Sequence, residues 1–122
     1  PGFLSQLPKY RLNGTARQIM SDLMWARMQA VSQNNKFKIF FLPDNHQYTI
    51  LDDVNNNGNI DSSEWTQTKD IQTDYSDVTI SKSSDPIFFA RGTAVATTIT
   101  LTNPAGTRIV KVNIAGRVKI DD

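Results

Sequence analysis

One amphipathic segment near the start of the chain, followed only by strand-like segments, limits what this sequence can fold into. Between residues 14 and 33, apolar side chains recur at the three- and four-residue steps of an α-helix: Ala16, Ile19, Met20, Leu23, Met24, Met28 and Val31. Asn13 or Thr15 can cap the start of this helix, and Asn34-Asn35 can end it. A second row beside the first makes the apolar face wide: Ile19, Leu23, Ala26 and Ala30. This width predicts a helix that lies across a sheet, or one that a partner covers in part.

The rest of the chain has the pattern of β-strands. Segments 36–42 and 47–52 flank Pro43-Asp44-Asn45-His46, whose residues favour a hairpin turn. Further strands are expected at 69–73, 77–82, 86–92, 97–102, 108–114 and 117–120. Alternating apolar and polar residues predict antiparallel strands with one buried face. One N-terminal helix followed by an antiparallel meander is an α+β order, and 122 residues suit a single domain.

Composition excludes several classes of protein. The chain has no cysteine, which excludes thiolate catalysis, cysteine-based zinc sites and a disulfide framework. No apolar run approaches the roughly 20 residues of a membrane span. The net charge is +1, which gives no overall attraction to nucleic acid or anionic lipid. The charge is unevenly spread, with a basic first third, an acidic middle from 44 to 85 and a basic last third, so either head-to-side assembly or a merely solvated surface is consistent with it.

Residues 53–64 carry the most specific chemical pattern in the chain, with the sequence DVNNNGNIDSSE. All five positions that define a calcium-binding loop agree. Calcium takes six to eight hard oxygen ligands, which one continuous turn can supply. Gly58 permits the sharp reversal, and Ile60 is expected to pin the loop to the core. The predicted ligands are the side chains of Asp53, Asn55 and Asn57, the carbonyl of Asn59, Asp61 directly or through water, and a bidentate Glu64.

The setting of this loop predicts a structural role for calcium. The residues before it form a predicted strand, so the EF-hand-like loop is expected outside a helix-loop-helix, without the switch that such a unit provides. Only three of its ligands are charged, which indicates an affinity of roughly 0.1–1 mM, as in extracellular modules. The alternative is an Asn-rich surface turn that matches the pattern by chance.

Few residues suit catalysis, and no enzyme activity or small-molecule substrate is predicted. His46 is the only histidine, and it lies in a predicted turn with no obvious partner to orient it. Gly92 and Gly116 are isolated and are explained as turn residues, not as a phosphate-binding motif.

Aromatic residues are expected to pack. Trp25 is predicted to pack on the sheet or on a neighbouring subunit, and Trp65 to anchor the exit of the Asn-rich loop. Phe88-Phe89 is expected to straddle a strand, with one ring buried and the other at a surface or interface.

Three stretches resemble the GspH/FimT-type pseudopilins and minor pilins. Residues 15–41, TARQIMSDLMWARMQAVSQNNKFKIFF, resemble the region of that family in which the helix runs directly into the first strand. Residues 109–120, IVKVNIAGRVKI, resemble the last hairpin and the GR-containing tail. Residues 1–13 resemble the segment after the apolar half of a pilin's N-terminal helix, with Pro1 at the helix-kinking proline. Acidic loops similar to residues 53–64 occur in many members.

The resemblance implies a pilin-like fold and a role in assembly. Members of this family are made as prepilins with a cleaved leader, are held in the inner membrane by an apolar helix, and join other pilins in a type IV pilus or a type II secretion pseudopilus. Residues 1–122 would then form one periplasmic domain without the leader and the apolar half-helix. Residues 1–35 would be the remnant of the helical spine, and 36–122 the β-rich head. The choice between secretion, pilus and DNA uptake stays open.

Two alternatives accompany this interpretation. Some FimT-type proteins bind DNA through a C-terminal GRxR-like motif, and here Arg117 and Lys119 occupy its charged positions. Lysine is a poorer bidentate phosphate ligand than arginine, and the Asp121-Asp122 that follows would oppose DNA, so DNA binding ranks second. Solvated charges on a hairpin explain the same residues. The third alternative is a calcium-dependent extracellular adhesion domain unrelated to filaments.

Overall fold

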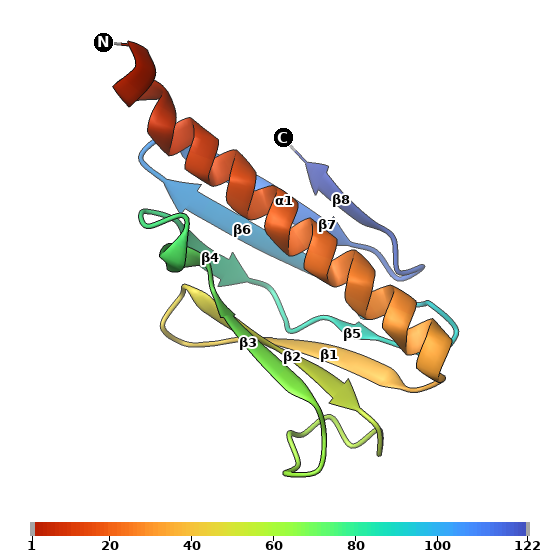
Figure 1. The fold of residues 1–122 in the computed structure, drawn as a ribbon. Helices are drawn as coiled ribbons and strands as arrows, with labels where there is room; N and C mark the ends of the chain where they lie inside the picture. The colour runs from red at the N-terminus through yellow and green to blue at the C-terminus, as the bar shows by residue number, and fades with distance from the viewer. Residues whose placement is uncertain (1, 122) are drawn as a thin grey trace.

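One long helix lies along two antiparallel sheets in the computed structural model, which describes residues 2–121 (Figure 1). The elements in chain order are α1 Gly2–Gln33, β1 Lys36–Phe41, β2 Gln47–Asp53, β3 Thr66–Asp70, the short 3-10 helix η1 Ile71–Thr73, β4 Thr79–Lys82, β5 Ile87–Phe88, β6 Thr97–Asn103, β7 Gly106–Val112 and β8 Val118–Asp121. In the described part of the chain, no helix combines the length and the apolar character that crossing a bilayer requires.

The helix begins earlier than its apolar periodicity predicts. It starts at Gly2 and includes Pro8, so the prediction that Asn13 or Thr15 caps it was wrong. Both residues lie inside the helix, and the Thr15 hydroxyl donates to the Arg11 carbonyl oxygen at 2.9 Å. The N-terminal turns extend past the ends of the sheets in Figure 1, so they have little core to cover and no periodic apolar pattern to reveal them.

The predicted end of the helix is confirmed. Asn34 has a positive φ of 58°, and the Asn35 N–H donates to the Ala30 carbonyl at 3.3 Å. A left-handed residue of this kind commonly ends a helix and turns the chain away from its axis. The chain then enters β1 at Lys36.

The strands form two four-stranded sheets. The first has the order β3-β2-β1-β5 and the second has the order β4-β6-β7-β8. Every pairing is antiparallel, which confirms the predicted α+β class. The expected meander was wrong in one respect, because β5 returns to pair with β1 and β4 pairs with β6. The strand expected at 69–73 lies at Thr66–Asp70, and the residues after it form η1.

The core lies between the helix and the sheets. The helix contributes one buried row to it: Leu12, Ala16, Ile19, Leu23, Ala26 and Ala30. Phe88 of β5 is 0% exposed, whereas the neighbouring Phe89 is half-buried, as expected for a pair that straddles a strand.

The other predicted apolar row of the helix is not core. Met24, Met28 and Val31 are 51%, 61% and 52% exposed. The apolar face is wider than the surface that the two sheets can cover, and its outer edge remains in solvent.

A partly buried polar cluster joins the helix to the first sheet. The Tyr48 hydroxyl donates to the Asp22 carboxylate and accepts from the Gln18 side-chain amide at 3.1 Å. Lys69 of β3 pairs with the same Asp22 carboxylate at 2.8 Å. Burial of the ring and the hydrogen bond to Asp22 raise the pKa of Tyr48 far above its usual range, which keeps the hydroxyl protonated as a donor.

Candidate metal site and cationic surfaces

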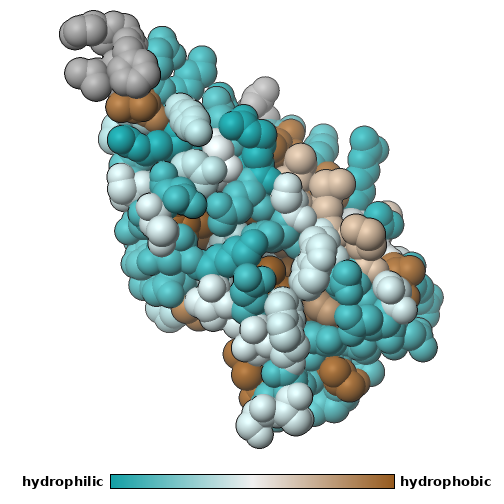
Figure 2. Space-filling model, in the orientation of Figure 1, coloured by the Kyte–Doolittle hydropathy of each residue, from teal (hydrophilic) through white to brown (hydrophobic). Residues whose placement is uncertain are grey.

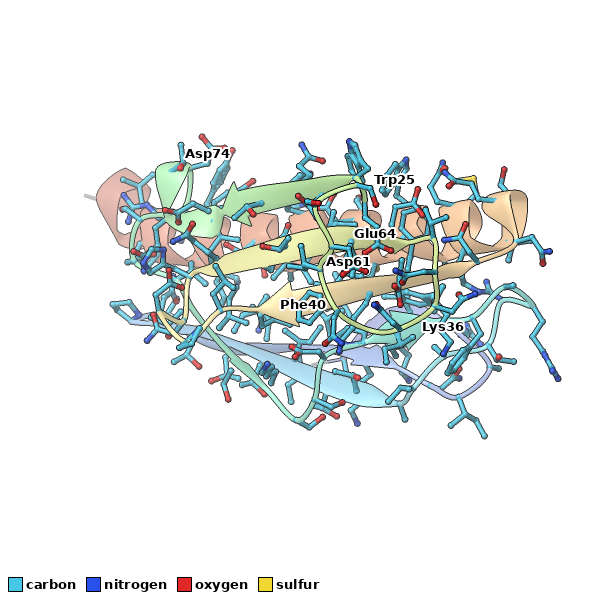
Figure 3. The ribbon with its side chains drawn as sticks, turned by 90° about the horizontal axis from the view of Figure 1, so that it is seen from below. Trp25, Lys36, Phe40, Asp61, Glu64 and Asp74 are labelled. Atoms are coloured by element: carbon cyan, nitrogen blue, oxygen red, sulfur yellow. The ribbon has the colours of Figure 1, made fainter. Side chains whose placement is uncertain are left out.

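The Asn-rich loop connects β2 to β3 and is therefore set between strands, as predicted. Figure 3 shows Asp61 and Glu64 close together on this loop. Two contacts hold it to β1. The Lys36 N–H donates to the Asn56 side-chain oxygen at 3.0 Å, and the Lys38 ammonium donates to the Gly58 carbonyl at 3.2 Å.

Short-range hydrogen bonds shape the loop. The Asn57 N–H donates to the Asn55 Oδ1 at 3.2 Å, and the Asn59 N–H donates to the Asn57 Oδ1 at 2.9 Å. Glu64 reaches back to accept from the Asp61 N–H at 3.1 Å. Gly58 has a φ of +75°, a conformation that favours glycine. These hydrogen bonds fold the polar side chains of the loop toward one another, as Asn-rich turns also do without an ion.

Asp53 is the most unusual member of the set. It ends β2 and is only 1% exposed. One carboxylate oxygen, Oδ2, accepts from the Gly58 N–H at 2.8 Å. The other, Oδ1, is buried and has no hydrogen-bond partner among residues 2–121. An unpaired buried carboxylate oxygen costs stability, and a bound cation would remove that cost.

Asp61 occupies the interior of the loop opposite the asparagines. The Asn57 side-chain amide donates to its carboxylate at 2.9 Å, and the Asn55 amide donates to the same oxygen. These two hydrogen bonds, that of Asn55 first, lower the pKa of Asp61. Within the described residues, no three acidic or histidine side chains converge as a metal cluster.

The loop thus has the oxygen donors that a hard cation prefers, drawn together by amide hydrogen bonds. The six predicted ligands remain a prediction. Ile60 is 54% exposed, so the expectation that it pins the loop to the core was wrong. The Lys36 N–H and the Lys38 ammonium hold the loop to β1 instead.

Trp65 fixes the exit of the loop. Its carbonyl accepts from the Asp52 N–H at 3.0 Å, and its ring centroid lies 5.6 Å from that of Trp25 on the helix. Trp25 also meets Phe37 of β1 edge-on, with the two ring centroids 5.9 Å apart. The predicted packing of Trp25 on the sheet is confirmed, and the two tryptophans connect the loop to the helix.

His46 lies in the predicted hairpin turn but has partners that the sequence did not reveal. Its Nδ1 lies 2.8 Å from an Asp70 carboxylate oxygen, and its Nε2 lies 3.6 Å from Asp44. The expectation that no residue orients it was wrong, because Asp70 is brought beside the turn by the pairing of β3 with β2.

Three positively charged side chains line a hollow on the second sheet, beside the C-terminal hairpin. Arg117 and Lys119 line it as the sequence suggested, and Lys111 of β7 joins them beside Ser83 and Thr98. Lys111 could not be predicted from the sequence, because only the β7–β8 register brings it opposite Lys119.

Asp121 offsets part of this charge. Its carboxylate lies 3.0 Å from the Lys111 ammonium and 3.9 Å from that of Lys119. The hydrogen bond from Lys111 and the two ammonium charges hold the pKa of Asp121 below its usual value. Asp121 therefore reduces the positive charge of the hollow. That the terminal acids oppose DNA stays a prediction, and Asp122 lies outside the described residues.

Arg27 joins the helix to two turns, and no sequence pattern marked it. Its Nε donates to the Gly92 carbonyl at 2.9 Å, and its Nη2 donates to the Ala115 carbonyl at 3.3 Å. Gly92 and Gly116 have φ values of +90° and +85°, which confirms their prediction as turn residues. A Cβ on Gly116 would lie 1.9 Å from the Gly92 carbonyl oxygen, so the two turns are in direct backbone contact.

Comparison with solved structures places this fold among pilins. The type IV minor pilin FimU of Pseudomonas aeruginosa strain PAO1 aligns with a TM-score of 0.70 and 20% identity, over 93% of this chain and 90% of that one. The minor pseudopilin EpsH of the Vibrio cholerae type 2 secretion system aligns with a TM-score of 0.72 and 11% identity, over 91% and 96%. At these identities the likeness shows the fold alone.

Comparison with families gives a more specific result. No match was found among curated proteins. The family model described as type II transport protein GspH matches residues 15–116, which is well over half of the chain and includes the helix from Thr15 onward, the Asn-rich loop and the turn at Gly116. The chain therefore belongs to the GspH family of pseudopilin and minor pilin proteins.

Proposed function

We propose that this chain is a structural subunit of a type II secretion pseudopilus or a type IV pilus. The match to the GspH family carries the proposal. The aligned folds of a minor pilin and a minor pseudopilin support it. So does the uncovered apolar row Met24, Met28 and Val31, since an exposed stripe of this kind suits contact with neighbouring subunits. The partners are other pilins, and an apolar helix encoded upstream of Pro1 would anchor the chain in the inner membrane, with residues 2–121 in the periplasm or the filament.

Deleting the gene in its own bacterium tests this role. We expect fewer assembled pili or less protein exported by type II secretion, because a filament that lacks an obligatory subunit assembles poorly. A plasmid-borne copy of the complete gene should restore the wild-type level, and an empty plasmid should not. Normal pili together with normal secretion in the deletion strain would contradict the proposal. An upstream coding region without an apolar segment of roughly 20 residues would contradict the anchor.

The Asn-rich loop is proposed to bind calcium as a structural brace. The oxygen donors of Asp53, Asn55, Asn57, Asn59, Asp61 and Glu64 fit calcium, which prefers carboxylate, amide and carbonyl oxygens. The strongest support is the buried Asp53 Oδ1 that has no partner in the described chain. A cation there would gain a fully desolvated carboxylate ligand.

Binding would keep the contact between Asp53 and Gly58 and rearrange the asparagine side chains. Asp53 keeps its Gly58 contact through Oδ2, so Oδ1 stays free to face the ion. Rotation of the Asn55 and Asn57 amides would present oxygen in place of the nitrogens that now donate to Asp61. The brace would connect β2 to Trp65 and, through the tryptophan pair, to the helix.

DNA uptake is a second candidate, favoured by one observation. Lys111, Arg117 and Lys119 share one hollow, and the described residues offer no ion-pair partner for Arg117. In a gel shift at low salt we expect weak retardation of duplex DNA, because phosphate contacts dominate non-specific binding. Arg117→Ala should weaken the shift, whereas Arg17→Ala, which removes an exposed arginine of the helix, should not. Absence of any shift would reject this candidate. Nothing in the fold favours the adhesion alternative.

A further inference from the structure

A groove runs beside the C-terminal half of α1, with arginines on its rim. Met24, Met28 and Val31 form one wall, while Arg91, Arg117 and Val118 lie on the other side. Figure 2 shows apolar side chains in a strip between this part of the helix and β8. The three helix residues are each more than half exposed, so no other part of the described chain covers them.

The groove is positively charged. No acidic residue lines it. Arg27 also lines it and is held by the Gly92 and Ala115 carbonyls, which are neutral acceptors and leave its charge uncompensated. In the described part of the chain, Arg91 and Arg117 have no ion pair. Such a groove fits a segment that presents apolar side chains between carboxylates.

One segment of this chain has that chemistry. Residues 54–65 of the Asn-rich loop expose Val54, Ile60 and Trp65, which are 60%, 54% and 46% exposed. Asp61 and Glu64 lie between these apolar residues, and the segment contains no lysine or arginine. The loop lies beyond the first sheet, whereas the groove lies between α1 and the start of β8, so the two surfaces are at different places on the molecule (Figure 1).

We propose that the groove of one copy of this chain binds the loop 54–65 of a second copy. In the calcium-free loop, the carboxylates of Asp61 and Glu64 would meet Arg91 and Arg117, while the exposed Ile60 covers Met24 and Met28. Calcium bound in the loop would compete for the same carboxylates. Because the two surfaces differ, the contact is heterologous and leaves each copy with one surface unused. Repetition of the contact builds a ring or an open chain of subunits. The inference deepens the proposed assembly function and rests on it for its biological role.

Two charge-reversal variants separate the surfaces. Arg91→Glu/Arg117→Glu disables the groove but keeps the loop, and Asp61→Arg/Glu64→Arg disables the loop but keeps the groove. Each variant alone should remain monomeric in sedimentation velocity at low salt, because like charges then face each other. An equimolar mixture should associate again, since the intact loop of one variant meets the intact groove of the other and the two reversed surfaces also carry opposite charges. Wild type should form larger species as its concentration rises.

Matched controls make the result specific. Arg17→Glu makes the same charge change at an exposed position of α1 outside the groove and should leave association unchanged. Each reversal should weaken self-association by about tenfold or more, and circular dichroism should confirm that the variants are folded. All runs contain EDTA, so the result does not depend on calcium binding.

Wild type that stays monomeric up to about 1 mM, a concentration that would detect even a weak contact, would overturn this inference. Failure of the mixed variants to associate while wild type does so would overturn the pairing of loop with groove. Either result leaves the filament role testable, since that role is judged by pili and secretion in the bacterium.

Discussion

Replacing Gly116 with alanine is expected to lower the free energy of unfolding by about 3 kcal/mol. Two causes add at this position. The φ of +85° is costly for any residue with a Cβ. The new Cβ would also lie 1.9 Å from the Gly92 carbonyl oxygen and 2.7 Å from the Arg27 Nε. Because both neighbours belong to the joint between the helix and the two turns, relief of the clash must disturb that joint. Urea unfolding followed by circular dichroism measures the change.

Gly106→Ala is the matched control for this prediction. Gly106 also has a positive φ, of +132°, but a Cβ there would meet nothing within 4 Å. The Gly106→Ala variant therefore has the backbone strain without the clash. We expect its free energy of unfolding to fall by about 1 kcal/mol. Equal losses for the two variants would show that backbone contact between the turns contributes nothing to stability.

Adding about 10 mM calcium is expected to stabilise the protein by about 1 to 3 kcal/mol relative to EDTA, if the affinity is roughly 0.1–1 mM. The rise follows from mass action, since the ion binds the folded loop and not the unfolded chain. It should appear as an increase of several degrees in the melting temperature. Magnesium at the same concentration should have a smaller effect, because it requires a tighter octahedral shell and loses its water reluctantly.

Substitutions in the loop test whether calcium stabilises the protein by binding there. Asp53→Asn and Glu64→Gln should each remove most of the calcium-dependent rise, measured within the same variant with and without the ion. Asp74→Asn, which changes an exposed acid outside the loop, should keep it. Identical melting of wild type in calcium and in EDTA would refute the calcium brace. Loss of the rise in Asp74→Asn as well would point to non-specific screening.

Each of these two predictions concerns a feature that could be predicted only in part from the sequence. The calcium pattern is a local pattern, with every proposed ligand between Asp53 and Glu64, so it could be read directly. The buried Oδ1 of Asp53, which has no hydrogen-bond partner among the described residues, could not be predicted from the sequence, because its burial depends on how β2 packs. Gly116 could be recognised as a turn residue, but its contact with Gly92 joins positions 24 residues apart in the chain.

Most of the secondary structure could be predicted from local patterns in the sequence. The end of the helix at Asn34, the hairpin at 43–46 and most strands follow from periodicity and turn residues, which act over a few neighbouring positions. The family resemblance also rested on contiguous stretches, in the helix and the tail, and the GspH match confirms it.

Only the tertiary structure decided how these elements share one core. In the folded chain the row from Leu12 to Ala30 is buried. Met24, Met28 and Val31 are exposed to solvent, although both rows have the same helical spacing. The strands also form two separate sheets, and Arg27 connects two turns. These outcomes depend on contacts between residues far apart in the chain. A local pattern states that a side chain is apolar or that a strand can pair, and only the packed chain determines which partner it meets.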